Sequence, residues 1–167
     1  MGAGLLAAFL VLGLQARAQD DAPVAIQRYV ESVRLGDYLK EVRLAYPPLR
    51  EWPSFRAPGD KLTHYQIERA AAKNFPQGVE TMRFALRWGR VVLVQAIYTE
   101  RRAKERPLEK MVVQLSLRYG EPKRRGMAYT WQDGRTVLRA FNTEISSPGG
   151  AVEMRPSIEI YEAALRD

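Results

Sequence analysis

The spacing of apolar residues predicts a short helix early in the chain. Leu39, Val42 and Tyr46 fall on one side of such a helix, three and four positions apart. Asp37 is a good N-cap residue, because its carboxylate can accept hydrogen bonds from the free N–H groups of the first turn. The Pro47–Pro48 pair ends the helix, since proline lacks the N–H group and disfavours a helical conformation in the preceding residue.

A longer helix is predicted from Pro107 to Tyr119. Apolar residues form one stripe at helical spacing: Leu108, Met111, Val112, Leu115 and Tyr119. Proline is favourable in the first turn of a helix, and Gly120 suits the position just after the last turn. We expect the stripe to be buried, so that Leu115→Ala lowers the free energy of unfolding by about 2–5 kcal/mol.

Alternating apolar and polar residues predict a β-hairpin in the middle of the chain. Its strands cover residues 81–88 and 90–100, and Gly89 forms the turn. Residues 91–94 are all apolar, so the second strand has two apolar faces. Such a strand belongs at the centre of a sheet.

A second hairpin joins residues 127–132 to residues 136–142. The Asp133–Gly134 pair between them is a strong signal for a tight turn. Ser146–Gly150 then reads as a flexible loop, and a last strand is predicted around residues 157–161.

Three segments are harder to assign. Residues 26–35 fit a helix face or a strand, and we favour a strand over residues 30–34. Residues 61–73 also fit both, and we favour a strand followed by a loop through residue 78. Residues 51–59 read as a loop held to the body by Trp52 and Phe55.

The predicted order is β-α-β-β-β-α-β-β-β, which indicates the α+β class. We expect an antiparallel sheet of about five to seven strands, with the two amphipathic helices packed on one face. Each helix precedes a group of strands and ends near a Tyr-Pro or Tyr-Gly-Glu-Pro sequence. Two α-β-β pseudo-repeats would explain this similarity between the two halves of the chain.

The stretches LGDYLKEVRLAYPP and EKMVVQLSLRYGEP carry a resemblance to a known group of envelope proteins. They are similar to the Gly-x-x-x-x-Glu-Val…Leu-Gly-x-Pro signature of small bacterial domains of the SmpA/OmlA type, which are outer-membrane assembly lipoproteins, and of the β-lactamase-inhibitor-like fold. The resemblance implies helices packed on an antiparallel sheet, a protein-binding or scaffolding role, and no enzyme activity. The chain departs from the lipoproteins because it has no lipobox cysteine.

The N-terminus has the pattern of a secretory signal peptide. An apolar run over residues 4–14 precedes the small-x-small sequence Ala16-Arg17-Ala18. We expect residues 1–18 to be cleaved after Ala18, residues 19–25 to be a leader and residues 26–167 to form a single domain. The protein would then be periplasmic or secreted in a bacterium, with no transmembrane segment after cleavage. A buried N-terminal helix is the alternative.

The amino-acid composition excludes several kinds of functional site. The chain has no cysteine, which excludes disulfides, thiolate metal sites and a cysteine nucleophile. His64 is the only histidine, and no ligand spacing surrounds it. We find no catalytic motif and expect no metal or cofactor. Trp52, Trp88 and Trp131 are interpreted as core or hairpin-packing residues, with a ligand platform as the alternative.

Basic residues cluster on both sides of the predicted second helix, in a chain of net charge +7. Candidate anion-binding residues are Arg101, Arg102, Lys104 and Arg106 before it, and Lys123, Arg124 and Arg125 after it. The helix would be about 20 Å long, so the clusters would lie at opposite ends. Solvated loops are the alternative interpretation.

These observations predict a non-enzymatic, exported binding or scaffold domain. An envelope protein or an anionic envelope component would be its partner, whereas nucleic acid is not expected there. A hydrolase or lyase acting on an anionic cell-envelope polymer is the alternative.

Overall fold

The computed structural model describes residues 24–146 and 150–165 of the 167-residue chain. The predicted signal peptide, its cleavage site and the middle of the predicted loop at 146–150 lie outside the described residues. The first elements are two very short strands, β1 (Tyr29–Val30) and β2 (Val33–Arg34), which form a hairpin of their own.

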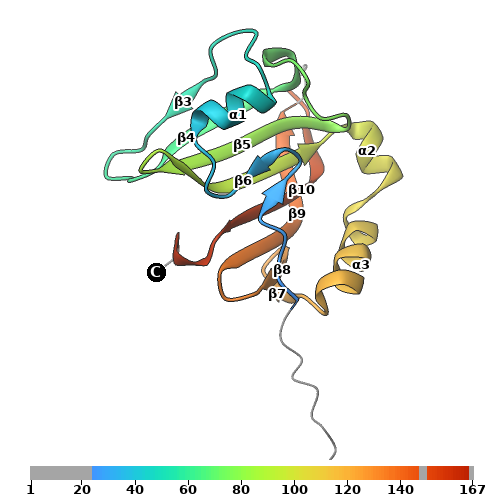
Figure 1. The fold of residues 1–167 in the computed structure, drawn as a ribbon. Coiled ribbons are helices and arrows are strands. Elements are labelled where there is room, and N and C mark those ends of the chain that lie inside the picture. The colour runs from blue at the N-terminus through green and yellow to red at the C-terminus, as the bar shows by residue number, and fades with distance from the viewer. Residues whose placement is uncertain (1–23, 147–149, 166–167) are drawn as a thin grey trace, which may run out of the picture.

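The remaining elements form two successive groups, each a helical segment followed by four strands (Figure 1). The first group contains α1 (Leu39–Ala45), β3 (Ser54–Phe55), β4 (Thr63–Glu68), β5 (Val79–Arg87) and β6 (Arg90–Tyr98). The second contains α2 (Glu100–Glu105), α3 (Leu108–Tyr119), β7 (Lys123–Arg125), β8 (Ala128–Gln132), β9 (Thr136–Ser146) and β10 (Val152–Glu162). Short 3₁₀ turns cover Arg69–Ala71 and Ala163–Leu165.

All eight strands of the two groups join one antiparallel sheet, in the order β3-β4-β5-β6-β10-β9-β8-β7. Each group is a meander, and the last strands of the two meanders pair with each other at the sheet centre. The α+β class is confirmed, as is the central place of β6. The expected strand number was too low, because the edge strands β3 and β7 have only two and three residues and no apolar alternation.

The core lies on one face of this sheet. Its strand residues lie next to each other across the strands, as in Ile67–Met82, Phe84–Val94 and Ile160–Leu138. Val42 of α1 and Leu108 and Met111 of α3 are buried in the same cluster. Each such side chain contributes about 1.5–3 kcal/mol through burial.

The longer predicted helix is confirmed as α3. It ends at Gly120, whose φ of 80° favours glycine and whose N–H group donates to the Ser116 carbonyl. Leu115 is only partly buried, so the cost expected for Leu115→Ala was too high. Leu108 and Met111 are the α3 residues whose side chains are buried in the core.

The first helix begins one residue later than predicted. Tyr38 is the N-cap, and its N–H group donates to a Glu41 carboxylate oxygen at 2.6 Å. Asp37 instead accepts a hydrogen bond from the Arg34 N–H group at 2.8 Å. Asp37 therefore holds the turn that leads from β2 into α1.

Other segments differ from the predictions because local turns interrupt them. The strand expected at residues 30–34 is split by a turn at Glu31, where φ is +54°. The strand expected within residues 61–73 stops at Glu68, and the Arg69–Ala71 turn follows. The predicted last strand extends to eleven residues in β10. In the part of the chain that the structure describes, no helix has the length and apolar character needed to cross a membrane.

Candidate functional site

The face of the sheet opposite the core carries a polar row that crosses seven of the eight strands. The register places its members directly beside one another. They are Gln66, Arg83, Gln95, Glu159, Arg139, Thr130 and Lys123. We call this side of the sheet the open face, because the helices that supply core side chains pack on the other side.

Contacts between neighbouring strands fix the side chains of this row at two places. The Arg83 Nε–H group donates to the Gln66 Oε1 atom at 3.0 Å. The Arg139 guanidinium and the Glu159 carboxylate form an ion pair at 2.9 Å, and both side chains are largely buried. Ion pairs and hydrogen bonds between neighbouring strands hold long side chains in one geometry, so this part of the face is ordered in advance of any binding.

A second network lies beside the row. The Gln95 Nε2 atom donates to the Thr143 hydroxyl at 3.0 Å, and the hydroxyls of Thr143 and Ser157 are 2.7 Å apart. Gln95 and Ser157 are buried. Because these polar groups have partners, their burial on the open face is not costly.

A broad groove occupies one end of the open face, and we call it the sheet groove. Its volume is about 1010 Å³. The lining comes from β4, the Arg69–Ala71 turn, β5, α2 with its N-cap, β9 and β10, and combines both signs of charge: Gln66, Glu68, Arg69, Ala70, Glu80, Thr81, Arg83, Thr99, Glu100, Arg101, Glu144, Ile145, Ser146, Glu153 and Arg155. The strong twist of the sheet, seen in Figure 1, sets β4–β5 at an angle to β9–β10.

The charged groups of the sheet groove are partly paired. Arg155 contacts the carboxylates of Glu153 and Glu100. Its Nε atom is buried and has no hydrogen-bond partner among the residues that the structure describes. A hydrogen bond from Lys104 and the charge of that lysine hold the pKa of Glu100 below its usual range. Glu100 therefore stays ionised at neutral pH and is not suited to donate a proton.

The first predicted basic cluster lies on a helix instead of a loop. Three of its cations pair with glutamates of α2 itself. The Lys104–Glu100 distance is 2.7 Å, and Arg101 and Arg102 each lie 3.9 Å from Glu105. These pairs reduce the positive charge that α2 offers to an anion, and of the cluster only Arg101 lines the sheet groove.

The fourth cation of that cluster, Arg106, follows the last turn of α2 and acts on Tyr98. Burial raises the pKa of Tyr98 to about 12, and the Glu31 carboxylate adds to the rise. Arg102 and Arg106 oppose it. Burial also raises the pKa of Glu31, with Arg102 opposing.

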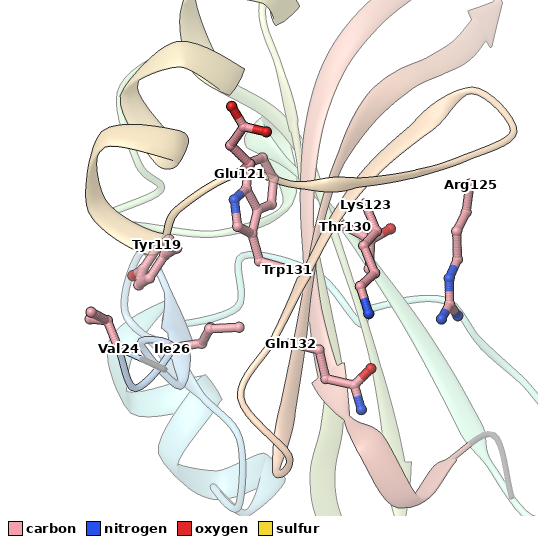
Figure 2. A pocket seen from close by; sticks show the side chains of 9 residues that line it. All are labelled: Val24, Ile26, Tyr119, Glu121, Lys123, Arg125, Thr130, Trp131 and Gln132. Carbon is pink, nitrogen blue, oxygen red and sulfur yellow. The ribbon is translucent and has the colours of Figure 1, made fainter. Parts of the chain in front are cut away.

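The second predicted cluster forms the edge strand β7. Lys123, Arg124 and Arg125 are exposed there, and Arg124 lies 5.6 Å over the Tyr129 ring. Lys123 and Arg125 border a small pocket of about 130 Å³. Figure 2 shows these two side chains on one side of the β7–β8 hairpin, whereas Tyr119 and Trp131 lie on the other.

The structure does not bring the two basic clusters together. Figure 1 places α2 before α3 and β7 after it, at opposite ends of the helix. One anion site built from both clusters is therefore not formed. Where the alternative interpretation expected solvated loops, the structure has the helix α2 and the edge strand β7.

The single histidine lies next to an acid. His64 Nε2 is 3.0 Å from Asp60 Oδ2, and the Phe55 ring stacks on the imidazole at 4.9 Å between centroids. Hydrogen bonds from the Leu62 N–H group and from His64 keep the pKa of Asp60 below its usual range. Within the described residues, no hydroxyl group is hydrogen-bonded to this pair, and no group of three acidic or histidine side chains could hold a metal ion.

The tryptophans differ from one another. Trp52 and Trp131 are 3% and 4% exposed, and their Nε1–H groups donate to the carbonyls of Ala71 and Gly120. These two confirm the expected packing role. Trp88 is 83% exposed, so the prediction was wrong for this residue, as it was for Phe55, which is 64% exposed.

The sequence carried no single signal for the sheet groove. Its residues come from six elements, several of them far apart in the sequence, and they meet only in the folded sheet, whose register the sequence does not reveal. A short alternation in β5, where Thr81 and Arg83 alternate with the apolar Met82 and Phe84, was the visible trace. In comparisons with known proteins, no family model, curated protein or solved structure matches the chain.

Proposed function

We propose that the protein is a non-enzymatic binding or scaffold protein of the bacterial envelope, which holds a protein partner in the sheet groove. The observation that carries this proposal is the groove itself, open and lined by charged side chains on the face of the sheet away from the core. Interaction sites are commonly built on such rigid, ordered surfaces. The similarity of two short stretches to envelope assembly domains agrees with it.

The cellular location is part of the same proposal. The apolar run at residues 4–14 and the Ala16-Arg17-Ala18 sequence support export and cleavage after Ala18. The mature protein would be periplasmic or secreted. We further propose that the two groups, each a helical segment followed by four strands, are pseudo-repeats of one unit, since both end in a strand that pairs at the sheet centre.

The charge pattern of the sheet groove indicates what kind of segment fits it. Its lining contains both arginine and glutamate side chains, so a partner with one sign of charge would meet repulsion as well as attraction. A polypeptide segment that carries both signs matches the lining better than a uniformly anionic polymer does.

Site-specific photo-cross-linking in cells tests the proposal. A photoreactive amino acid at Thr81, which lines the sheet groove, should give a discrete cross-linked product with an envelope protein. The same residue at Leu117, which is exposed on α3, serves as the matched control. Equal products from both positions, or none from Thr81, would contradict the proposal.

The alternative function, hydrolysis or elimination on an anionic envelope polymer, is favoured by one observation, the His64–Asp60 pair. If that pair is catalytic, purified protein should shorten an anionic cell-wall polysaccharide, and His64→Ala should abolish the reaction. Unchanged polymer length with the natural protein would reject this function.

A further inference from the structure

The turn between β5 and β6 places a tryptophan where the backbone disfavours it. Arg87 pairs with Arg90, so Trp88 and Gly89 are the two central residues of the turn. Their φ values are +51° and +78°. A two-residue hairpin turn with two positive φ values is usually built from Asn-Gly or Gly-Gly, because a bulky side chain is strained in that conformation.

The strain at Trp88 is not balanced by burial of the side chain. The indole is 83% exposed, whereas the other two tryptophans are almost completely buried. The guanidinium group of Arg87 lies over the indole, 4.5 Å from the ring centre. Strained residues that persist without a packing benefit are concentrated at functional sites. The exposed indole is therefore available for contact with a partner outside the chain.

Cations surround this turn. Trp88 borders a surface hollow of about 480 Å³ together with Arg56 and Lys61, which belong to the loop between β3 and β4. That loop lies beside the β5–β6 turn at one end of the sheet (Figure 1). Asp60 is the one acidic residue in the lining, and it is paired with His64.

Two further cations flank the indole along the hairpin. Arg87 and Arg90 are its neighbours in the strands, and the Arg90 guanidinium lies 4.3 Å over the partly exposed Tyr38 ring. We call the group of Trp88, Arg56, Lys61, Arg87 and Arg90 the Trp88 tip. It combines one large aromatic side chain with four positive charges.

We infer that the Trp88 tip docks on the headgroup region of an anionic lipid bilayer. Tryptophan prefers the membrane–water interface, where its ring contacts the apolar part of the lipids and its N–H group remains hydrated. Lysine and arginine are attracted by anionic headgroups, and the charge of the tip is complementary to such a surface. One aromatic side chain and four cations give a weak, reversible and salt-sensitive attachment.

This attachment would leave the sheet groove free. The groove is lined by Glu80 and Thr81 at the beginning of β5, whereas Trp88 follows the end of that strand. The tip would orient the protein on a membrane surface with its proposed binding groove directed away from the lipid. The inference depends on the geometry of the tip and not on the proposed function.

Intrinsic fluorescence tests the inference, because Trp88 is the exposed tryptophan and reports its own environment. The purified protein is mixed with vesicles of phosphatidylglycerol and phosphatidylethanolamine, and with vesicles of phosphatidylcholine alone. The anionic vesicles should shift the emission to shorter wavelength, protect it from acrylamide and, with brominated lipid, quench it. The protein should also sediment with them, and added salt should release it.

Variants separate docking from folding. Arg56→Glu with Lys61→Glu keeps the fluorescent probe and should weaken binding to anionic vesicles at least about tenfold. Trp88→Asn should lose sedimentation with vesicles but raise the melting temperature, because asparagine suits the turn. Leu117→Asn removes an equally exposed apolar side chain from α3 and should bind like the natural protein.

Three results would overturn the inference. The first is an unchanged Trp88 emission with anionic vesicles. The second is equal sedimentation of the Trp88→Asn and natural proteins. The third is binding of the tip to a soluble anionic polysaccharide but not to vesicles, which would assign it to carbohydrate instead of lipid.

Discussion

Single residues join parts of the chain that the sequence keeps far apart, and Asp133 is the clearest case. Its carboxylate accepts hydrogen bonds from the N–H groups of Arg135 and Thr136, as expected for a turn residue. It also accepts one from the Ile26 N–H group at 2.6 Å, which fixes the start of the folded chain to the β8–β9 turn. The turn could be predicted from the Asp-Gly pair, but the contact with Ile26 could not, since 107 positions separate the two residues.

The stability that Asp133 contributes should depend on pH. Burial raises its pKa, but the hydrogen bonds from Ile26, Thr136 and Arg135 outweigh that effect and leave the pKa below its ordinary value. The folded state therefore stabilises the ionised Asp133 carboxylate more than the unfolded state does. This stabilisation is fully present above the unfolded pKa of about 3.9 and is lost as the pH falls through the lower folded pKa.

Accordingly, Asp133→Asn should lower the free energy of unfolding by about 1–3 kcal/mol at neutral pH. The difference from the natural protein should decrease below about pH 4, where the aspartate also becomes neutral. Urea unfolding of both proteins at neutral and acidic pH measures this. A difference that does not change with pH would show that the carboxylate charge is not the cause.

Among the elements, α3 shows what periodicity can and cannot predict. Its existence, its length and its glycine stop follow from the sequence. The stripe also identifies the side of the helix that faces the sheet, but it does not say that Leu108 and Met111 are fully buried whereas Val112, Leu115 and Tyr119 are only partly buried. Met111 is 3% exposed, whereas Leu117 on the same helix is 85% exposed.

Met111→Ala should lower the free energy of unfolding by about 2–5 kcal/mol, because it leaves a cavity in the core. Leu117→Ala is the matched control, with a change within about 0.5 kcal/mol, since it removes an exposed side chain from the same helix. Chemical denaturation gives both values. Similar losses in the two variants would mean that α3 does not pack as described.

Two elements were missed for identifiable physical reasons. The segment ERRAKE of α2 has no apolar stripe, so its charges suggested a loop. The visible signal was the i,i+4 spacing of Glu100 with Lys104 and of Arg101 with Glu105, which stabilises exposed helices. Strand β7 consists of three cations, and short, charged edge strands are a common protection against pairing with another chain. Its charges thus have a structural explanation beside the anion-binding hypothesis.

At the scale of the whole molecule, the pairing of β6 with β10 joins the two groups of elements. The five residue pairs of this contact include Val94 with Ile160, both fully buried. A single core cluster draws side chains from both groups. The antiparallel class and the central β6 could be predicted, but the pairing of the two meanders could not, because it links residues about 60 positions apart, far beyond the range of local turn signals.

We therefore expect one cooperative unfolding transition and the slowest amide exchange in β6 and β10. Exchange should be much faster in β3, β7 and α2, which lie at the edges and have few buried side chains. Hydrogen exchange followed by mass spectrometry measures these rates. Two separate transitions, one for each meander, would contradict the single core.

The position of β10 has a consequence for how the protein is made. The strand that comes last in chain order among the eight strands of the sheet is inserted between β6 and β9, in the middle of the sheet. A nascent chain that still lacks residues 152–162 has two unjoined half-sheets and cannot reach its final form. Synthesis order alone would thus keep the two half-sheets apart until residues 152–162 have been made.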